Sequence, residues 1–370
     1  MQVRNVQLYV IEMPLKKPFE THLETVSKRE SIIVELTDDE GRRGYGEVVA
    51  FSTPWYTEET VITCYHMLKD LLVPIVLNRE WTHPNELTSL FSAIKGNRMA
   101  KAGIETAIWD LFAKSQQAPL FQVLGGNRAT IPAGVAIGTT DVKAMLRQIE
   151  TYLDEGYQRI KLKIIPNQEY EMLSKVRQYF PDAPIMIDAN GAYSFHDDVD
   201  RLKALDDFGL LMIEQPFGNK HFIEHAKLQE QIKTPICLDE SIASIEDVKL
   251  AIQLNSCRLI NIKVGRVGGL AVAKAIHDYC LAEQVGVWCG GMLEFGVSRA
   301  HNIALSTLEG FQIPGDLSAS RRYWEQDIIE PEVEIDHGKI YVPTTPGIGF
   351  EINKKRLKQV CTYNESFLAK

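Results

Sequence analysis

Arg159-Ile-Lys-Leu-Lys163 and Ile185-Met-Ile-Asp188 begin a series of five short apolar segments, each of which ends in a charged residue. The other three are Leu210-Leu-Met-Ile-Glu214, Ile236-Cys-Leu-Asp239 and Leu259-Ile-Asn-Ile-Lys263, so the charged ends lie 25, 26, 25 and 24 residues apart. A polar turn and a stretch of helical periodicity follow each segment. One strand plus one helix, repeated at this length, predicts a (β/α)8 barrel, in which the carboxyl ends of the strands face one mouth. We therefore expect the five charged side chains to meet there.

The repeat extends in both directions from these segments. From Ile131-Pro-Ala-Gly-Val-Ala-Ile137 onward there are eight strand-like runs, which begin near residues 131, 159, 184, 210, 235, 258, 286 and 311. Earlier residues show strands first and helices afterwards, as in a small α+β domain. The sequence predicts an α/β protein with a (β/α)8-type TIM barrel at 127–320, an N-terminal α+β capping domain at 1–126, and a C-terminal segment at 321–370 that returns to the capping domain. We expect 14–28 to be a long irregular connection, of a kind that often covers active sites.

Composition narrows the class of partner. The 370 residues carry a formal net charge of -9, with 45% hydrophobic and 24% charged residues. Nucleic acids and anionic membranes attract clustered Lys and Arg, so we expect neither as a partner and expect a small molecule instead. The six cysteines show no C-x-x-C pairing, and the N-terminus has no basic segment followed by an apolar one. We therefore expect reduced thiols and a cytoplasmic location.

Three of the five strand ends carry carboxylates, at Asp188, Glu214 and Asp239. Carboxylates packed so closely repel one another unless a cation lies between them. A hard divalent ion such as Mg²⁺ takes oxygen ligands and keeps positions open for a substrate carboxylate, whereas the absence of His and Cys disfavours zinc. Each acid alone could equally cap the helix that follows it, but three in register favour a Mg²⁺ site, with Mn²⁺ as a substitute.

The other two strand ends carry lysines. Lys161 and Lys163 lie two residues apart, so a strand points both side chains to the same face. Crowding by a like charge and loss of water both lower a lysine pKa, which would make Lys163 a usable base at neutral pH. Lys263 ends the sixth strand, across the mouth. A base beside a bound carboxylate suits the removal of the weakly acidic proton α to that carboxylate. A K-x-K pair alone is more often a solvated strand, and the barrel period is what favours catalysis.

Three other patterns in the sequence suggest different chemistry. His221-Phe-Ile-Glu-His225 matches the H-x-x-E-H zinc-peptidase pattern, but it falls where an outer helix should begin. Lys263-Val-Gly-Arg-Val-Gly-Gly269 is rich in glycine without the spacing of a phosphate loop, and reads as a tight turn that places Arg266 at the mouth. A Schiff-base lysine, as in an aldolase, leaves the three aligned carboxylates unexplained.

The chain resembles the enolase superfamily, and within it the branch of o-succinylbenzoate synthases and N-succinylamino acid racemases. The resemblance covers essentially the whole length. Its motifs are Lys161-Leu-Lys163, Asp188-Ala-Asn190, Glu214-Gln-Pro216, Asp239-Glu-Ser241, Lys263, Ala107-Ile-Trp-Asp-Leu111 before Pro119-Leu120, Leu124-Gly-Gly126, and Gly290-Gly-Met-Leu-Glu294 followed by Arg299-Ala-His-Asn302. The metal and lysine set is specific for the superfamily, whereas the branch rests on the less specific segment at 290–302 and the turn after Lys263.

The resemblance implies roles for individual residues. It makes Lys163 and Lys263 the catalytic lysines, and Asp188, Glu214 and Asp239 the ligands of Mg²⁺. It gives supporting roles to Lys161, Asn190 and Glu240, and substrate contacts to Arg266, Gly291, Met292 and Leu293. The loops at 19–28 and 51–56 are expected to close over the pocket, and a homo-oligomer is expected.

Two reactions remain open, because the same five residues serve both. The synthase reaction dehydrates 2-succinyl-6-hydroxy-2,4-cyclohexadiene-1-carboxylate to 2-succinylbenzoate, a step of menaquinone biosynthesis; family precedent gives both proton transfers to Lys163. Racemisation of N-succinylamino acids needs one lysine on each face. We take the synthase as the principal expectation and the racemase, alone or as a second activity, as the alternative. A binding barrel without activity is a third reading, disfavoured because no member of the lysine and carboxylate set is substituted.

Overall fold

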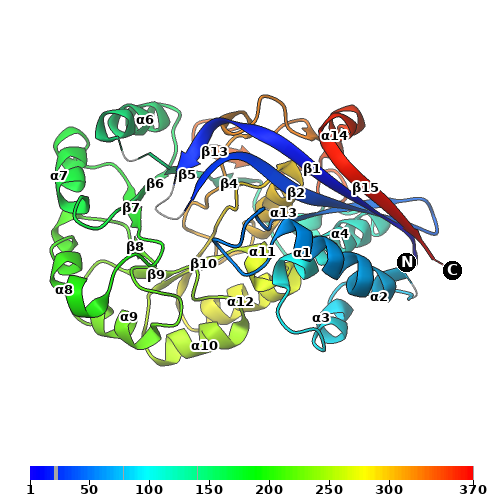
Figure 1. Cartoon of the computed structure of the whole chain (residues 1–370), viewed down its shortest axis with the longest axis horizontal. Coiled ribbons are helices and arrows are strands. Elements are labelled where there is room, and N and C mark those ends of the chain that lie inside the picture. Colours follow the sequence, from blue (N-terminus) through cyan, green and yellow to red (C-terminus); the bar gives the residue numbers. More distant parts are fainter. Residues whose placement is uncertain (21–23, 78, 140, 370) are drawn as a thin grey trace.

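A curled sheet of seven parallel strands forms the centre of the computed structural model, which describes residues 1–20, 24–77, 79–139 and 141–369 (Figure 1). In spatial order, the strands are β11 (Gly286–Cys289), β10 (Leu259–Ile262), β9 (Ile236–Leu238), β8 (Ile213–Glu214), β7 (Ile185–Asp188), β6 (Arg159–Lys163) and β5 (Gly134–Ile137). Helices lie outside the sheet: α6 (Val142–Asp154), α7 (Glu169–Tyr179), α8 (Phe195–Lys203), α9 (Phe222–Gln229), α10 (Ile245–Gln253), α12 (Leu270–Ala282) and α13 (Gly296–Leu305). The predicted α/β barrel architecture is confirmed.

The eighth segment differs from the strand expected near residue 311. No regular strand forms there within the described ranges, but the backbone at Gly315 joins both edges of the sheet. Gly134 N–H donates to Gly315 O at 2.8 Å, and Asp316 N–H donates to Cys289 O at 2.9 Å. Pro314 lacks an N–H for a longer ladder, and a Cβ at Gly315 would lie 2.6 Å from Cys289 O. This short closure brings Asp316 to the barrel mouth.

The capping domain is an antiparallel sheet covered by helices. Its strand order is β15 (Cys361–Leu368), β1 (Val3–Glu20), β2 (Thr25–Asp38) and β3 (Arg43–Val48). Because β15 pairs with β1, the C-terminal tail completes this sheet, as predicted, and the two termini lie close together in Figure 1. The covering helices are α1 (Val61–Met67), η1 (Leu68–Leu72), α2 (Val73–Leu77), α3 (Glu86–Phe91), α4 (Arg98–Ser115) and α5 (Leu120–Val123). The domain boundaries at 126 and 320 stay a prediction.

The expected irregular connection at 14–28 is largely a hairpin. Phe19 pairs with Val26 and Glu20 with Thr25, after a register shift between Pro14 and Phe19. Residues 21–23 of the expected loop lie outside the described residues. Two prolines interrupt the alternation of this segment, so its sequence hides the strand pairing. The hairpin carries Phe19 to the mouth of the barrel.

Close packing inside the capping domain is followed directly by hydrogen bonds from its sheet to the barrel. Gly46 in β3 lies against α4, where an added Cβ would lie 2.0 Å from Gly103 O. The next residue, Glu47, is buried and accepts the N–H groups of Phe295 and Ser298 at 2.9 and 2.8 Å. These bonds tie β3 to the start of α13, beside the barrel mouth.

The remaining elements are short. They comprise β4 (Thr130–Pro132), η2 (Asp206–Phe208), α11 (Val264–Val267), η3 (Ser320–Arg322), β12 (Ile329–Glu330), β13 (Lys339–Tyr341), β14 (Glu351–Ile352) and α14 (Lys354–Val360). β13 pairs with β4 rather than with the capping sheet. In the part of the chain that the structure describes, no helix combines the length and apolar character needed to cross a bilayer.

Candidate active site

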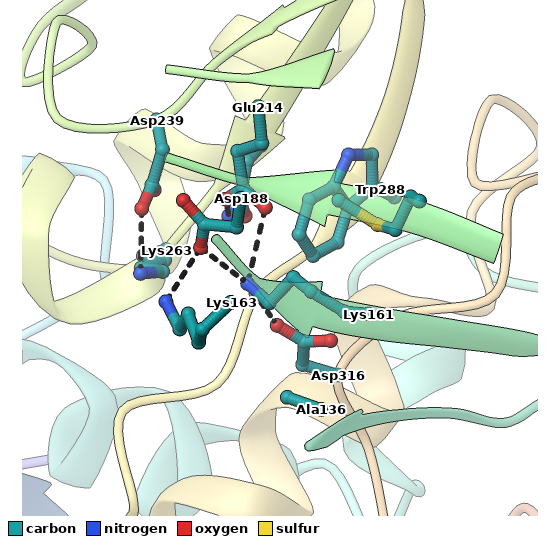
Figure 2. Close-up of polar contacts among 12 residues, drawn as sticks. Ala136, Lys161, Lys163, Asp188, Glu214, Asp239, Lys263, Trp288 and Asp316 are labelled. Atoms are coloured by element: carbon teal, nitrogen blue, oxygen red, sulfur yellow. Dashed lines mark hydrogen bonds and ion pairs between the residues drawn. The ribbon is translucent and has the colours of Figure 1, made fainter. Parts of the chain in front are cut away.

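Strand register brings the predicted residues together at the carboxyl ends of neighbouring strands (Figure 2). In the parallel ladder, Lys163 of β6 pairs with Asp188 of β7, and Asp188 pairs with Glu214 of β8. Asp239 and Lys263 directly follow β9 and β10. The 25-residue period therefore places all five side chains at one mouth.

Lys163 and Lys263 approach this mouth from opposite sides. Lys163 Nζ donates to Asp188 Oδ2 and Asn190 Oδ1, both at 2.6 Å. Lys263 Nζ donates to Asp239 Oδ2 at 2.8 Å and to the Tyr56 hydroxyl at 2.9 Å. Three strands, β7 to β9, separate the two lysines in the sheet, and both side chains line one cavity. A molecule between them would have an amine on each side.

Lys161 lies deeper and is held by three carboxylates. Its Nζ is 3.1 Å from Glu214, 3.2 Å from Asp188 and 2.8 Å from Asp316, and its side chain is only 4% exposed. The ammonium also lies 5.2 Å from the centre of the Trp288 ring. Lys161 is therefore placed to neutralise and position the carboxylates.

The expectation that crowding and burial lower a lysine pKa is wrong for Lys161, and the pKa of Lys263 is raised as well. Burial opposes the charged form of Lys161, but Asp316, Glu214 and Asp188 hold its pKa well above the usual value. Burial likewise opposes charge on Lys263, but Asp239 raises its pKa. Sequence reasoning considered the like charges and the loss of water, whereas carboxylates at 2.8 to 3.2 Å outweigh both.

The three carboxylates are buried and unequal. Burial raises the pKa of Glu214 to about 8, and the charge of Asp188 adds to this effect. Burial acts in the same direction on the other two, but Lys163 and Lys161 lower the pKa of Asp188, and Arg266 and Lys263 lower that of Asp239. Each of the three carboxylates contacts a lysine side chain. Among the described residues, no group of three or more His, Cys, Asp or Glu side chains is arranged so that it could hold a metal ion.

The donor set nevertheless fits a hard divalent cation. Three buried carboxylates end adjacent strands, and Glu214 has Asn261 Nδ2 as a second donor, at 2.8 Å. Carboxylate oxygens are the ligands that Mg²⁺ prefers. The positive charge of the lysines balances the repulsion between the three carboxylates, a role that sequence reasoning assigned to a metal ion alone. A cation at this point requires the carboxylates to exchange contacts with Lys161, Lys163 and Lys263 for metal contacts.

Lys163, Asn190 and Glu240 are joined by a chain of hydrogen bonds. Asn190 accepts from Lys163 and donates through Nδ2 to Glu240 Oε1 at 2.8 Å. Burial raises the pKa of Glu240 to about 7, and Asp239 adds to it. Asn190 can orient Lys163 directly, and Glu240 can do so by holding Asn190.

Arg266 is not among the residues that line the cavity, and its expected substrate contact stays a prediction. Its guanidinium bonds Asp239, and it donates to the Tyr56 hydroxyl at 2.8 Å and to the backbone oxygens of Ile242 and Asn261. The side chain is only 4% exposed. Arg266 can therefore act on chemistry through Asp239 and Tyr56, the two partners it shares with Lys263.

The cavity at this mouth is lined by residues of both the barrel and the capping domain. Its floor includes Lys161, Lys163 and Lys263, and its sides include the expected Gly291, Met292 and Leu293. The capping domain contributes four aromatic residues: Phe19, Phe51, Trp55 and Tyr56. The lining combines apolar walls with a charged floor, as binding of an organic carboxylate requires.

The H-x-x-E-H pattern has a structural explanation. The His225 ring is buried; its Nε2 accepts from Phe217 N–H at 3.2 Å, and its Nδ1 lies 2.7 Å from His221 O. Both nitrogens are thus occupied by backbone groups. The geometry agrees with the rejection of a zinc site.

Sequence reasoning gave no individual role to three residues of the site, Asp316, Asn261 and Tyr56, although it placed Tyr56 in the loop at 51–56. Asn261 precedes Lys263 by two residues, as Lys161 precedes Lys163, so the alternation of β10 could have revealed it. Asp316 follows an irregular segment, and Tyr56 belongs to the other domain. Neither shares the barrel period.

Comparisons with known proteins agree with this geometry. Residues 5–125 match the family described as mandelate racemase / muconate lactonizing enzyme, N-terminal domain, and residues 144–356 match the enolase C-terminal domain-like family. The chain is 52% identical to an o-succinylbenzoate synthase of Geobacillus stearothermophilus, over 99% of this chain and 97% of that protein. It is 43% identical to an N-succinylamino acid racemase of Thermus thermophilus, over 97% of both. A crystal structure of an enolase superfamily member from Listeria innocua has 44% identity, full coverage of both chains and a TM-score of 0.96.

Proposed function

Since the chain belongs to the mandelate racemase / muconate lactonizing enzyme family of the enolase superfamily, we propose that it is an o-succinylbenzoate synthase. The reaction is the dehydration of 2-succinyl-6-hydroxy-2,4-cyclohexadiene-1-carboxylate to 2-succinylbenzoate, in menaquinone biosynthesis. Relatives with that name match nearly the full length of the chain at 40% to 52% identity.

The observation that carries the proposal is the pair of lysines across one cavity. Lys163 and Lys263 line the same space, and each is bonded to a carboxylate at the end of a strand. Proton removal next to a carboxylate needs a base at the α-carbon and positive charge near the developing enolate. This arrangement supplies both.

In the proposed mechanism, Lys163 in its neutral form takes the α-proton. Asn190 holds the Lys163 amine, and Lys263 stabilises the negative charge that develops on the substrate carboxylate. Lys163 then returns the proton to the leaving hydroxyl, so that water departs and the ring becomes aromatic. The aromatic lining from the capping domain excludes water from this exchange.

Asp188, Glu214 and Asp239 would hold a divalent cation. Members of the superfamily generally bind divalent metal ions, and we propose Mg²⁺, with Mn²⁺ as a substitute, from the all-oxygen donor set. When bound, the ion supplies Lewis-acid stabilisation of the enolate. Lys161, with three carboxylate partners, keeps the ligands in place.

Racemisation of N-succinylamino acids is the second candidate, alone or as a further activity. The opposed positions of Lys163 and Lys263 favour it, because racemisation needs one acid and one base on opposite faces. Arg266 supports this candidate as well, since it contacts both Asp239 and Tyr56, the hydrogen-bond partners of Lys263.

A side-by-side kinetic comparison tests the proposal. With Mg²⁺ present, kcat/KM is measured for the cyclohexadiene carboxylate and for a panel of N-succinylamino acids. We expect turnover of the cyclohexadiene carboxylate at 10⁴ M⁻¹s⁻¹ or more, an order of magnitude typical of enzymes acting on their own substrates. If the protein racemises N-succinylamino acids but does not dehydrate the cyclohexadiene carboxylate, the second candidate replaces the first. If it shows neither activity, the chain is a binding protein. A cytoplasmic location and a homo-oligomer also remain predictions.

A further inference from the structure

A second hollow adjoins the proposed active site beside residues 17–19 of β1. Its lining includes Phe19 and Tyr323, which also line the catalytic cavity. The hairpin is held to this region because Lys16 N–H donates to Tyr323 O at 2.9 Å. The remaining lining residues are Lys17, Pro18, Gly138, Thr139, Gln148, Tyr152 and Arg322. The two spaces therefore meet at Phe19 and Tyr323.

Arg322 is the distinctive group of this hollow. Its guanidinium carbon lies 4.6 Å from the centre of the Tyr323 ring and 5.5 Å from that of Tyr152. Nε donates to the Tyr152 hydroxyl at 3.2 Å, Nη1 donates to the Tyr323 hydroxyl, and Nη2 donates to Ala136 O. A guanidinium has five N–H groups, so one on Nη1 and one on Nη2 remain available. The ring contacts and hydrogen bonds hold the group in one orientation.

Among the acidic side chains that the structure describes, a set that excludes Glu20, none forms an ion pair with Arg322. The four cations that line the catalytic cavity differ in this respect. Lys161, Lys163 and Lys263 bind the strand-end carboxylates, and Arg299 lies 3.4 Å from Glu294. Even the neighbouring Arg321, which is exposed, lies 3.8 Å from Glu155. An anion that enters the second hollow therefore meets, at Arg322, a guanidinium without an acidic partner among the described side chains, with Lys17 in the same lining.

The position of Arg322 suits the far end of a substrate whose reacting carboxylate is bound at the carboxyl ends of the barrel strands. Ala136, whose oxygen accepts from Arg322, lies in β5 and pairs with Lys161 of β6. Neighbouring strands lie about 4.8 Å apart, so Arg322 is one strand away from the lysine that holds Glu214 and Asp188. Figure 2 shows Ala136 beside Asp316 and Lys161. The hydrogen bond to Ala136 thus places the Arg322 guanidinium one strand away from the charged strand ends.

We propose that Arg322 binds the distal carboxylate of a dicarboxylate substrate and thereby selects succinyl compounds over acyl compounds that lack this charge. The inference rests on the proposed function for the identity of the ligand, since 2-succinylbenzoate carries one carboxylate on the ring and one at the end of the succinyl chain. The planar fork of Arg322 matches a carboxylate in a way that a lysine does not.

Ligand binding tests this role independently of turnover. Calorimetry on the Mg²⁺-loaded protein compares 2-succinylbenzoate with 2-butanoylbenzoate, in which a methyl group replaces the distal carboxylate. We expect the wild type to prefer 2-succinylbenzoate by about 10- to 100-fold, the range for a charge-assisted pair. Arg322→Gln should lose most of that preference, Arg322→Lys should retain part of it, and Arg321→Gln should leave it unchanged.

The same measurements separate binding from a structural role. If Arg322 only braces Tyr152 and Ala136, then Arg322→Gln weakens both ligands by the same factor, and the proposal is overturned. A wild type without preference also overturns it. Absence of cyclohexadiene dehydration, by contrast, rejects the synthase proposal, while a charge preference that depends on Arg322 would still support the carboxylate site.

Kinetics add a check: Arg322→Gln should raise KM for N-succinylamino acids by about tenfold or more and leave KM for N-butanoylamino acids within about twofold.

Discussion

Lys263 Nζ lies 2.8 Å from Oδ2 of Asp239, so a proposed catalytic amine and a proposed metal ligand share one hydrogen bond. The same relationship holds between Lys163 and Asp188 at 2.6 Å. Each carboxylate must therefore divide its oxygens between an amine and a cation. A cation bound by Asp239 would compete with Lys263 for the same carboxylate, so occupation of the metal site and the charge of Lys263 are coupled by this contact.

Metal binding should stabilise the fold. Mg²⁺ at about 100 times its Kd contributes about 2.7 kcal/mol to the free energy of unfolding, which should raise Tm by several degrees. Glu214→Gln should abolish this shift, whereas Glu171→Gln, which changes a side chain that is 79% exposed, should retain it. Differential scanning calorimetry with and without a chelator measures the effect. A Glu214→Gln protein with the full shift would remove Glu214 from the ligand set.

Lys263→Ala should separate the two reactions. Racemisation needs an amine on each face, so we expect its rate to fall by roughly 10³-fold or more. Exchange of the α-proton with D₂O should persist for only one enantiomer of an N-succinylamino acid, because Lys163 still serves one face. Proton NMR of each enantiomer follows the exchange. Equal exchange of both enantiomers would show that Lys263 does not serve the second face.

Tyr56→Phe removes one partner of Lys263 while Asp239 remains. The lost hydroxyl accepts hydrogen bonds from Lys263 and Arg266. We expect racemisation to slow by about tenfold and dehydration by less than about threefold, because only the former moves a proton through Lys263. Tyr363→Phe, a change on an exposed ring of the capping domain, serves as the control. Equal losses in both reactions would indicate that Tyr56 acts on the shape of the cavity.

His225 should make stability depend on pH. Burial lowers its pKa from 6.5 to about 4, so the folded protein binds fewer protons than the unfolded chain between these values. Its contribution is present above pH 6.5 and is lost as the pH falls towards 4, by about 3 kcal/mol in total.

Denaturant unfolding at pH 7 and at pH 4.5 measures the His225 contribution. His225→Gln should flatten the loss between the two pH values, and His66→Gln, on a side chain that is 67% exposed, should not. A slope that is the same in all three proteins would assign the acid sensitivity to other groups.

The sequence predicts the barrel and its charged mouth because both depend on local regularity. A strand and a helix repeat every 25 residues, and strand alternation then aligns Lys161 with Lys163. The parts that were wrong or missed depend on contacts between distant segments. The closure at Gly315 is a pair of hydrogen bonds rather than a strand, and Tyr56 reaches Lys263 from another domain.

The electrostatics of the site could not be predicted for a related reason. Spacing shows that amines and carboxylates converge, but their pairing depends on distances of 3 Å. Asp316 binds both Lys161 and Arg159, and it belongs to the one barrel segment without a regular strand. The pKa of Lys161 is raised by carboxylates from three different segments. Only the folded chain shows that these attractions outweigh burial and like charge.

The most direct test of the central claim is the dehydration kinetics of Lys163→Ala. Lys163 touches the cavity and is not part of the apolar core, so the variant should fold and bind 2-succinylbenzoate. We expect kcat/KM for the cyclohexadiene carboxylate to fall by roughly 10³-fold or more, with an unchanged circular dichroism spectrum. Synthase activity at the wild-type level in Lys163→Ala would contradict the assignment of Lys163 as the acid/base group.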